Sequence, residues 1–214
     1  MSQVRVHNFS VSLDGFGTGE GLSFEAPFGH AGERLHEWMI ATRFWHSIVG
    51  EAGGSAGIDD AFAERHTPGI GAEIMGRGKF GPAGRGPWGD DPWKGWWGDT
   101  PPFHKPVFVL THHEREQLTL SDTTFTFVTD GIESALERAR EAAGDKDVFI
   151  GGGAEVINRF LEARLVDELE LHVVPILLGG GARLFEGVGP EVKLELVRVV
   201  EAPGVTHLKY SVVP

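Results

Sequence analysis

The second half of the chain alternates strand-like and helix-like segments, and this alternation limits the folds that the chain can adopt. The runs 106–111, 125–128 and 147–150 are rich in apolar residues, as in strands that are buried on both faces. Because strands that alternate with helices form mainly parallel sheets, we predict an α/β fold with three α/β/α layers. Two further runs, 192–200 and 205–213, predict antiparallel strands at the C-terminal end of this sheet.

The rest of the chain predicts fewer regular elements. Apolar periodicity and glycine content predict a strand at 4–11, a long loop at 15–30, helices at 33–49 and 59–64, and strands at 72–75 and 169–178. Asp130 is the predicted N-cap of the helix after 125–128, with Glu133 completing a capping box, and Gly144 is its predicted end.

The segment 81–106 is unusual in its composition. It holds six glycines, six prolines and four tryptophans, which neither a helix nor a central strand tolerates. Tryptophans need a surface to cover, so the segment faces a substrate, packs on the core as a surface loop, or contacts a second subunit. We treat the whole chain, 1–214, as one domain with this segment as an insertion.

Composition excludes several classes of function. The chain has no cysteine, which excludes disulfides, thiolate metal sites and a cysteine nucleophile. A net charge of −12 disfavours binding to nucleic acid or to anionic membranes. We expect no metal site, because the adjacent His112 and His113 would point to opposite sides of an extended chain. No apolar run could span a membrane and the N-terminal residues do not resemble a secretion signal, so we expect a cytoplasmic protein.

The sharpest local signal is a strand, a glycine turn and a helix at 148–154. Glycines after a strand let a ligand approach the backbone, and the free amides of the next helix suit phosphate. Gly151, Gly152, Gly153 and Ala154 are therefore candidate phosphate-binding residues. A tight turn that only needs glycine's conformational freedom is the alternative.

Two other strand ends can meet this turn at one edge of the sheet. Gly76 and Arg77 follow the strand 72–75, and Thr111 and His112 follow the strand 106–110. Together they offer a guanidinium, a hydroxyl and an imidazole, which makes a dinucleotide groove plausible. The run 76–81 matches G-x-G-x-x-G, but we reject a Rossmann site because the motif does not open a long helix.

In their order along the chain, these pieces resemble the dihydrofolate reductase-like superfamily. That superfamily includes the reductase domain of the bifunctional riboflavin-pathway deaminase-reductases and its stand-alone bacterial relatives. The resemblance covers nearly the whole chain and is carried by the segments 12–15, 74–77, 109–111, 149–155, 165–169 and 175–181.

The resemblance implies an NADPH-dependent oxidoreductase that reduces a pterin-like or aminopyrimidine heterocycle by hydride transfer. By resemblance, Gly76 and Arg77 meet the coenzyme phosphates, and Thr111 with His112 lies near the adenosine 2′-phosphate. The turn 151–154 would hold the pyrophosphate or nicotinamide side, and Asp14 and Gly15 would stand at the mouth of the substrate cleft. Relatives are often dimers, so a homodimer is an open expectation.

Two departures from the family pattern leave the substrate open. Deaminase-reductases usually carry a glutamate where this chain has Gly151. Folate reductases place an acidic residue in the first long helix, and Glu33 and Glu37 lie there without a matching motif. The proton donor is not identified by the sequence. A nucleotide-binding or dimeric interaction protein that keeps the fold without catalysis is the alternative function.

Overall fold

The strands of the chain form one mixed sheet. The computed structural model describes residues 2–65, 68–81, 86–88 and 93–213. Within these residues the sheet has nine strands in the order β4-β5-β3-β2-β6-β1-β7-β9-β8. Their bounds are β1 Val4–Ser12, β2 Ile70–Gly76, β3 Pro106–Leu110, β4 Leu118–Leu120, β5 Thr123–Val128, β6 Asp147–Gly152, β7 Glu168–Val174, β8 Lys193–Ala202 and β9 Val205–Val213.

The direction of the strands confirms the predicted α/β class. The six strands from β5 to β7 in this order pair in parallel. At the edges, β4 is antiparallel to β5, and β9 is antiparallel to both β7 and β8. The C-terminal hairpin therefore forms the antiparallel end that the sequence predicted.

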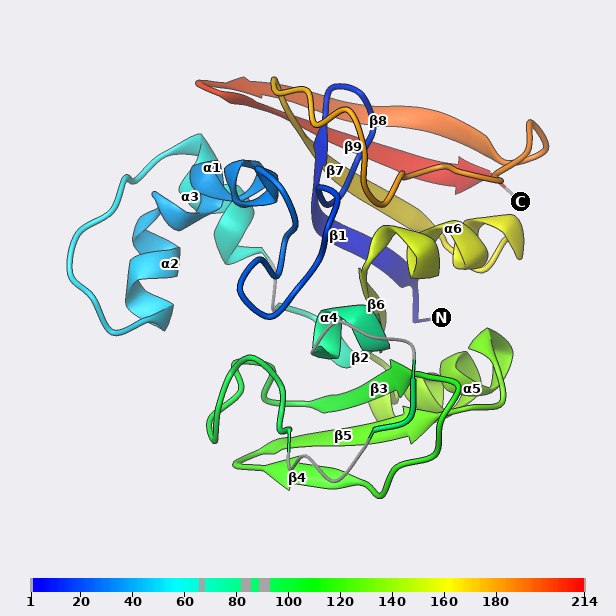
Figure 1. Cartoon of the computed structure of the whole chain (residues 1–214). Helices are drawn as coiled ribbons and strands as arrows, with labels where there is room; N and C mark the ends of the chain where they lie inside the picture. The colour runs from blue at the N-terminus through cyan, green and yellow to red at the C-terminus, as the bar shows by residue number, and fades with distance from the viewer. Residues whose placement is uncertain (1, 66–67, 82–85, 89–92, 214) are drawn as a thin grey trace.

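Helices lie on both sides of the sheet (Figure 1). The helices α5 (Ile132–Ala143) and α6 (Ala154–Glu162) cover what we term the first face. On the other, or second, face lie the 3-10 helix η1 (Gly32–Leu35) and the short helices α1 (Glu37–Ile40), α2 (Arg43–Ile48) and α3 (Ile58–Glu64). Among the described residues, no helix is both long enough and apolar enough to cross a membrane.

The two faces differ in how their cores are built. The first face carries one continuous apolar cluster, which includes Val6, Ile74 and Ile150. The second face carries two separate clusters. One gathers around Trp38 and Phe62 over the ends of β7, β8 and β9, and the other lies over β2, β3, β4 and β5. The strands between them, β6 and β1, are where polar side chains collect.

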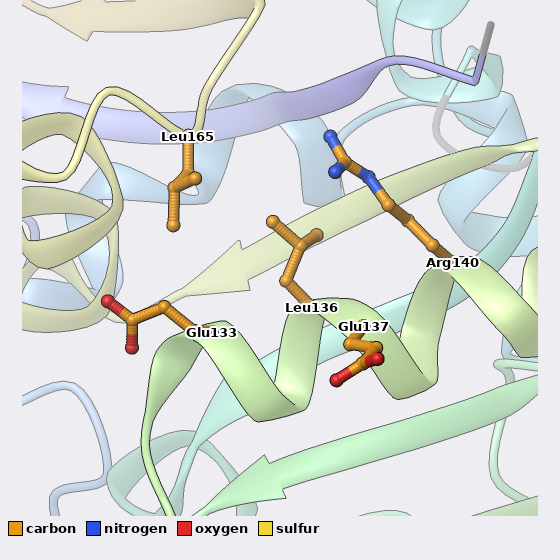
Figure 2. A pocket seen from close by; sticks show the side chains of 5 residues that line it. All are labelled: Glu133, Leu136, Glu137, Arg140 and Leu165. Carbon is orange, nitrogen blue, oxygen red and sulfur yellow. The ribbon is translucent and has the colours of Figure 1, made fainter.

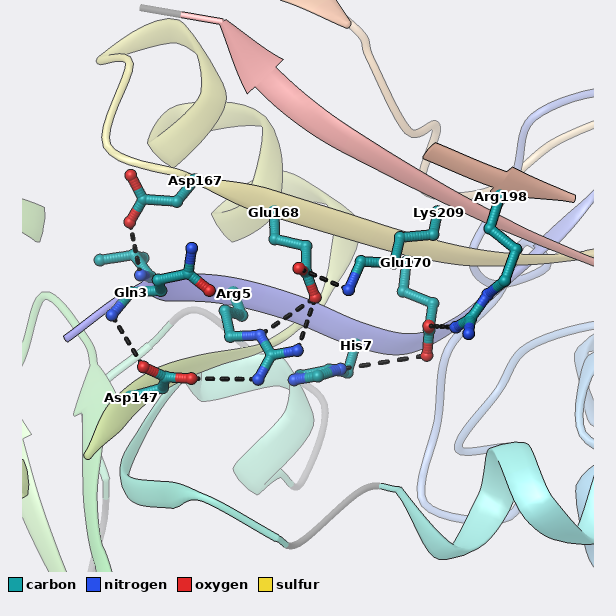
Figure 3. A network of polar contacts seen from close by, with 10 residues as sticks. Gln3, Arg5, His7, Asp147, Asp167, Glu168, Glu170, Arg198 and Lys209 are labelled. Atoms are coloured by element: carbon teal, nitrogen blue, oxygen red, sulfur yellow. Dashed lines mark hydrogen bonds and ion pairs between the residues drawn. The ribbon is translucent and has the colours of Figure 1, made fainter. Parts of the chain in front are cut away.

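These polar side chains form a strip of ion pairs across the second face, shown in Figure 3. Arg5 on β1 bonds Glu168 on β7 at 2.6 Å and Asp147 on β6 at 3.0 Å. Lys209 on β9 reaches the same Glu168 at 2.6 Å. Because a partly buried arginine with two carboxylates is well satisfied, the strip fixes the first strand to both of its neighbours.

The predicted helix at 33–49 is wrong as one element, because it is divided into η1, α1 and α2. Thr42 accounts for the break between α1 and α2. Its buried hydroxyl donates to the carbonyl of Met39 and accepts from the amide of Trp45, which makes it the N-cap of α2. A threonine that caps a new helix cannot also continue the preceding one.

Other local predictions also need correction. The N-cap of α5 is Gly131, whereas Asp130 binds Ser134 and Arg138 through its carboxylate. The strand predicted at 169–178 ends at Val174, just before a proline that cannot donate to the ladder. The short strand β4 and the one-turn helix α4 (Arg77–Phe80) were not predicted.

Three tryptophans of the segment 81–106 pack on the core. Trp88, Trp93 and Trp97 lie against the apolar cluster over β2 to β5, and Trp96 stacks on Phe24 with 5.7 Å between ring centroids. Residues 82–85 and 89–92 of the predicted insertion lie outside the described residues. The packed-loop interpretation therefore accounts for Trp88, Trp93 and Trp97, whereas Trp96 covers the exposed ring of Phe24.

Candidate functional site

Three neighbouring strand ends create the candidate site. In the order β3-β2-β6, Gly76 pairs with Leu110 and Met75 pairs with Gly152. The residues that follow these strands, including Thr111 and Gly153, therefore leave the sheet at one edge. The structure brings the three predicted segments together, as the parallel arrangement requires.

Two glycines at this edge, Gly76 and Gly153, differ in the space that surrounds them. A Cβ on Gly76 would lie 2.8 Å from Cγ2 of Val156, so glycine lets β2 end against α6. A Cβ on Gly153 would meet no described atom within 4 Å. Gly153 is also the N-cap of α6, and no side chain among the described residues caps that helix. The open backbone at Gly153, beside the first amides of α6, is what an anion would use.

Arg77 supplies the positive charge of the edge. Its guanidinium stacks on Trp88 at 3.8 Å from the ring centroid, and Nη1 donates to the carbonyl of Gly86. Its Nε is buried and has no hydrogen-bond partner among the described residues. Burial lowers the pKa of Arg77 from its ordinary value, but the arginine remains a cation at neutral pH.

Trp88 also connects Arg77 to the end of β3. Its indole Nε1 donates to the carbonyl of His113 at 2.9 Å. The hydroxyl of Thr111 accepts from the amide of His113 at 3.2 Å, which forms a tight turn, and His112 is exposed within that turn. Arg77, Thr111 and His112 are thus joined through one tryptophan at the same edge.

Asp14 and Gly15 lie further along the sheet, at the end of β1. The Asp14 carboxylate accepts bonds from the Ser12 hydroxyl at 2.6 Å and from the amides of Leu178 and Gly179. The bond from Ser12 is the main reason that the pKa of Asp14 is lowered to about 2. Asp14 therefore holds two loops together. Gly15 lines an apolar hollow of about 260 Å³ beside β7, β8 and β9.

A buried ion pair next to the glycine turn was not recognised from the sequence. Glu73 in β2 is 1% exposed and accepts a 2.8 Å bond from Lys79 in α4. His36, between η1 and α1, lies close enough that burial and the charge of Lys79 lower its pKa to about 4. A glutamate in the middle of an otherwise buried strand was the one signal that could have revealed this pair.

A second hollow, of about 330 Å³, lies elsewhere (Figure 2). It runs along α5 on the first face, and its lining includes the exposed Glu133, Glu137 and Arg140. It includes no residue of the strand edge. In the part of the chain that the structure describes, no three His, Asp or Glu side chains are grouped to hold a metal ion.

The sequence matches a known protein family and two curated proteins. Residues 5–208 match the family described as the RibD C-terminal domain. Of the two curated proteins, both uncharacterized and from Bacillus subtilis (strain 168), YwjB is 35% identical over 75 residues, which are 35% of this chain and 42% of YwjB. The other, YyaP, is 30% identical over 118 residues, which are 52% of this chain and 62% of YyaP. The matched segments thus span less than two thirds of either relative.

Two solved structures share the fold at low sequence identity. The diaminohydroxyphosphoribosylaminopyrimidine deaminase/5-amino-6-(5-phosphoribosylamino)uracil reductase of Thermotoga maritima aligns with a TM-score of 0.57 and 14% identity, over 99% of this chain and 57% of that one. The dihydrofolate reductase of Enterococcus faecalis, complexed with NADP(H) and RAB-propyl, aligns with a TM-score of 0.52 and 15% identity. That alignment covers 98% of this chain and 96% of the reductase. These likenesses identify the fold alone.

Proposed function

Because this chain belongs to the RibD C-terminal domain family, we propose that it is a reductase that uses NADPH to reduce a pterin-like or aminopyrimidine heterocycle of the riboflavin-pathway type. The observation that carries the proposal is the shared edge of β3, β2 and β6, with an uncapped helix and a guanidinium beside it. Such an edge is where parallel α/β sheets bind nucleotides.

The residues of this edge suit the coenzyme. The open backbone of Gly153 and the first amides of α6 would hold the pyrophosphate. The buried Nε of Arg77 is a donor without a partner among the described residues, so a phosphate would satisfy it. We assign Arg77 to the adenosine 2′-phosphate, with Thr111 and His112 near it. When bound, the coenzyme supplies the hydride, and the chain's own residues bind and orient the two reactants.

The alternative function is a nucleotide-binding or dimeric interaction protein that keeps the fold without hydride transfer. This alternative would be favoured if the protein bound NADPH tightly but did not oxidise it with any heterocycle tested. The position of Asp14 and Gly15 at the mouth of a substrate cleft remains a proposal. The Asp14 carboxylate already accepts three hydrogen bonds from within the chain.

Replacing Arg77 with alanine tests the coenzyme assignment. We expect NADPH to bind about 10- to 100-fold more weakly, because a charge-assisted bond to phosphate contributes about 1.5–3 kcal/mol. NADH lacks the 2′-phosphate, so its affinity should change much less. Fluorescence titration measures both affinities, because tryptophans near the edge transfer energy to the reduced coenzyme.

Arg140→Ala is the matched control, because this arginine is exposed on α5 and lines the hollow that includes no residue of the strand edge. It should leave both affinities unchanged. Equal losses of NADPH and NADH in the Arg77 variant would refute the assignment of Arg77 to the 2′-phosphate.

We also propose that the protein forms a homodimer through β8. This strand is the last in the sheet and exposes Leu196 (59%), Val197 (57%) and Val199 (53%). The apolar hollow beside Gly15 borders the same strand through Leu194. A second copy would cover these side chains and the unpaired strand edge, which single subunits seldom leave open.

Light scattering after size-exclusion chromatography should give twice the subunit mass of 23.2 kDa. Leu196→Lys should convert the dimer to a monomer, because it places a charge in the proposed interface. Leu22→Lys, at an exposed loop position, is the control and should remain dimeric. A wild-type mass near 23.2 kDa would rule the dimer out.

A further inference from the structure

The ion pair between Glu73 and Lys79 lies directly against the glycine turn. A Cβ on Gly151 would lie 2.1 Å from Oε1 of Glu73 and 2.7 Å from Nζ of Lys79. Contacts this short cannot exist, so the pair occupies the space in which a side chain at residue 151 would stand. Residue 151 is therefore a glycine because the carboxylate of Glu73 on β2 and the ammonium group of Lys79 in α4 fill the space of its side chain.

The two members of the pair are not equally accessible. The Glu73 side chain is 2% exposed and the Lys79 side chain is 28% exposed. Phe149 and Phe103 lie within 5.6 Å and 5.9 Å of the ammonium group, from ring centroid to Nζ. Lys79 is thus the member that a ligand could touch, and Glu73 holds it in place from below.

Arg77 and Lys79 both belong to α4, but their side chains lie toward different strands of the edge. Arg77 turns toward Trp88 at the end of β3, whereas Lys79 turns toward Gly151 and Phe149 on β6. One helical turn thus carries one cation on each side of the strand edge. If Arg77 marks the adenosine end of a bound dinucleotide, Lys79 lies toward the other end.

Other titratable groups around Gly151 are poorer proton donors. The low pKa of His36 leaves it neutral at neutral pH. Lys105 lies before the start of β3, at the opposite end from the turn, and donates to the carbonyl of Phe103. His7 is buried beneath Phe149, with Nδ1 3.9 Å from Glu170. Of the groups compared here, all within the described residues, Lys79 is a cation that reaches the surface and borders the turn.

We propose that Lys79 is the proton donor of the reduction, acting at the nicotinamide end of the coenzyme, and that Glu73 is its positioning residue. The inference rests on the proposed function. The bound coenzyme would supply a hydride to the carbon of a C=N or C=O bond. The nitrogen or oxygen takes the proton from Nζ, and Lys79, then a neutral amine, regains a proton from water.

The test needs no substrate, because the nicotinamide ring is positively charged in NADP⁺ and neutral in NADPH. An ammonium group near the ring weakens NADP⁺ relative to NADPH. Lys79→Met should therefore lower the ratio of the dissociation constants, NADP⁺ over NADPH, by about fivefold. Glu73→Gln removes the compensating negative charge and should raise the same ratio, also by a few-fold.

A lower ratio in Lys79→Met together with a higher ratio in Glu73→Gln would indicate an electrostatic role, because a loss of structure would not change the ratio in opposite directions. Lys79→Arg keeps the charge and should stay within about twofold of wild type, as should Lys193→Met on the exposed strand β8. If Lys79→Met does not fold, the Glu73→Gln arm decides alone. An unchanged ratio in Glu73→Gln would overturn the inference. Failure of the wild type to bind either coenzyme would instead refute the proposed function and, with it, the inference.

Discussion

Gly181→Ala is expected to lower the stability of the protein by about 4 kcal/mol, whereas Gly179→Ala, two residues earlier, should cost about 1 kcal/mol. Both glycines have positive φ, +124° and +74° respectively, which L residues adopt at a cost. Only at Gly181 would the new Cβ strike backbone, because it would lie 1.9 Å from the carbonyl oxygen of Thr18. At Gly179 it would meet no described atom within 4 Å.

Thermal unfolding monitored by circular dichroism distinguishes the two variants. For a chain of this size, about 4 kcal/mol corresponds to a decrease of roughly 10 °C in melting temperature. Gly179→Ala should lose only a few degrees and keep the bond from its amide to Asp14. Similar melting temperatures for the two variants would show that the backbone at Thr18 does not lie against Gly181.

The parts of the fold that were predictable are those in which local pattern determines structure. The run around β6 and α6 could be identified because apolar residues on both sides of three glycines leave few alternatives. The helix predicted at 33–49 failed because its apolar spacing continues through Thr42, while the hydroxyl of Thr42 caps a new helix. Periodicity does not show which hydrogen bond a threonine makes.

In the candidate site, too, some contacts could be predicted from the sequence and others could not. Gly76, Arg77, Thr111 and the glycine turn could be grouped because the carboxyl ends of parallel strands share an edge. The closeness of Glu73 to Gly151 could not be predicted, because it depends on β2 lying next to β6 and on α4 folding back over the second face. The carboxylate of Glu73 on β2 occupies the space in which a side chain at position 151 would stand.

Gly153→Glu is expected to weaken NADPH binding by about 100-fold, because a free carboxylate would compete for the amides at the start of α6. The φ of Gly153 is −69°, outside the left-handed region, and its Cβ would meet no described atom within 4 Å. Gly153→Gln adds nearly the same volume without the charge and should weaken binding less than about tenfold. Circular dichroism checks that both variants are folded before their affinities are compared.

The fluorescence titration of wild type and Gly153→Glu with NADPH, carried out side by side, tests the coenzyme site most directly. We predict saturable energy transfer from tryptophan to the coenzyme in the wild type, and a curve displaced by about two orders of magnitude in the variant. A variant that is folded and binds NADPH as tightly as the wild type would contradict the site at the start of α6. A wild type that shows no binding at any NADPH concentration would contradict it equally.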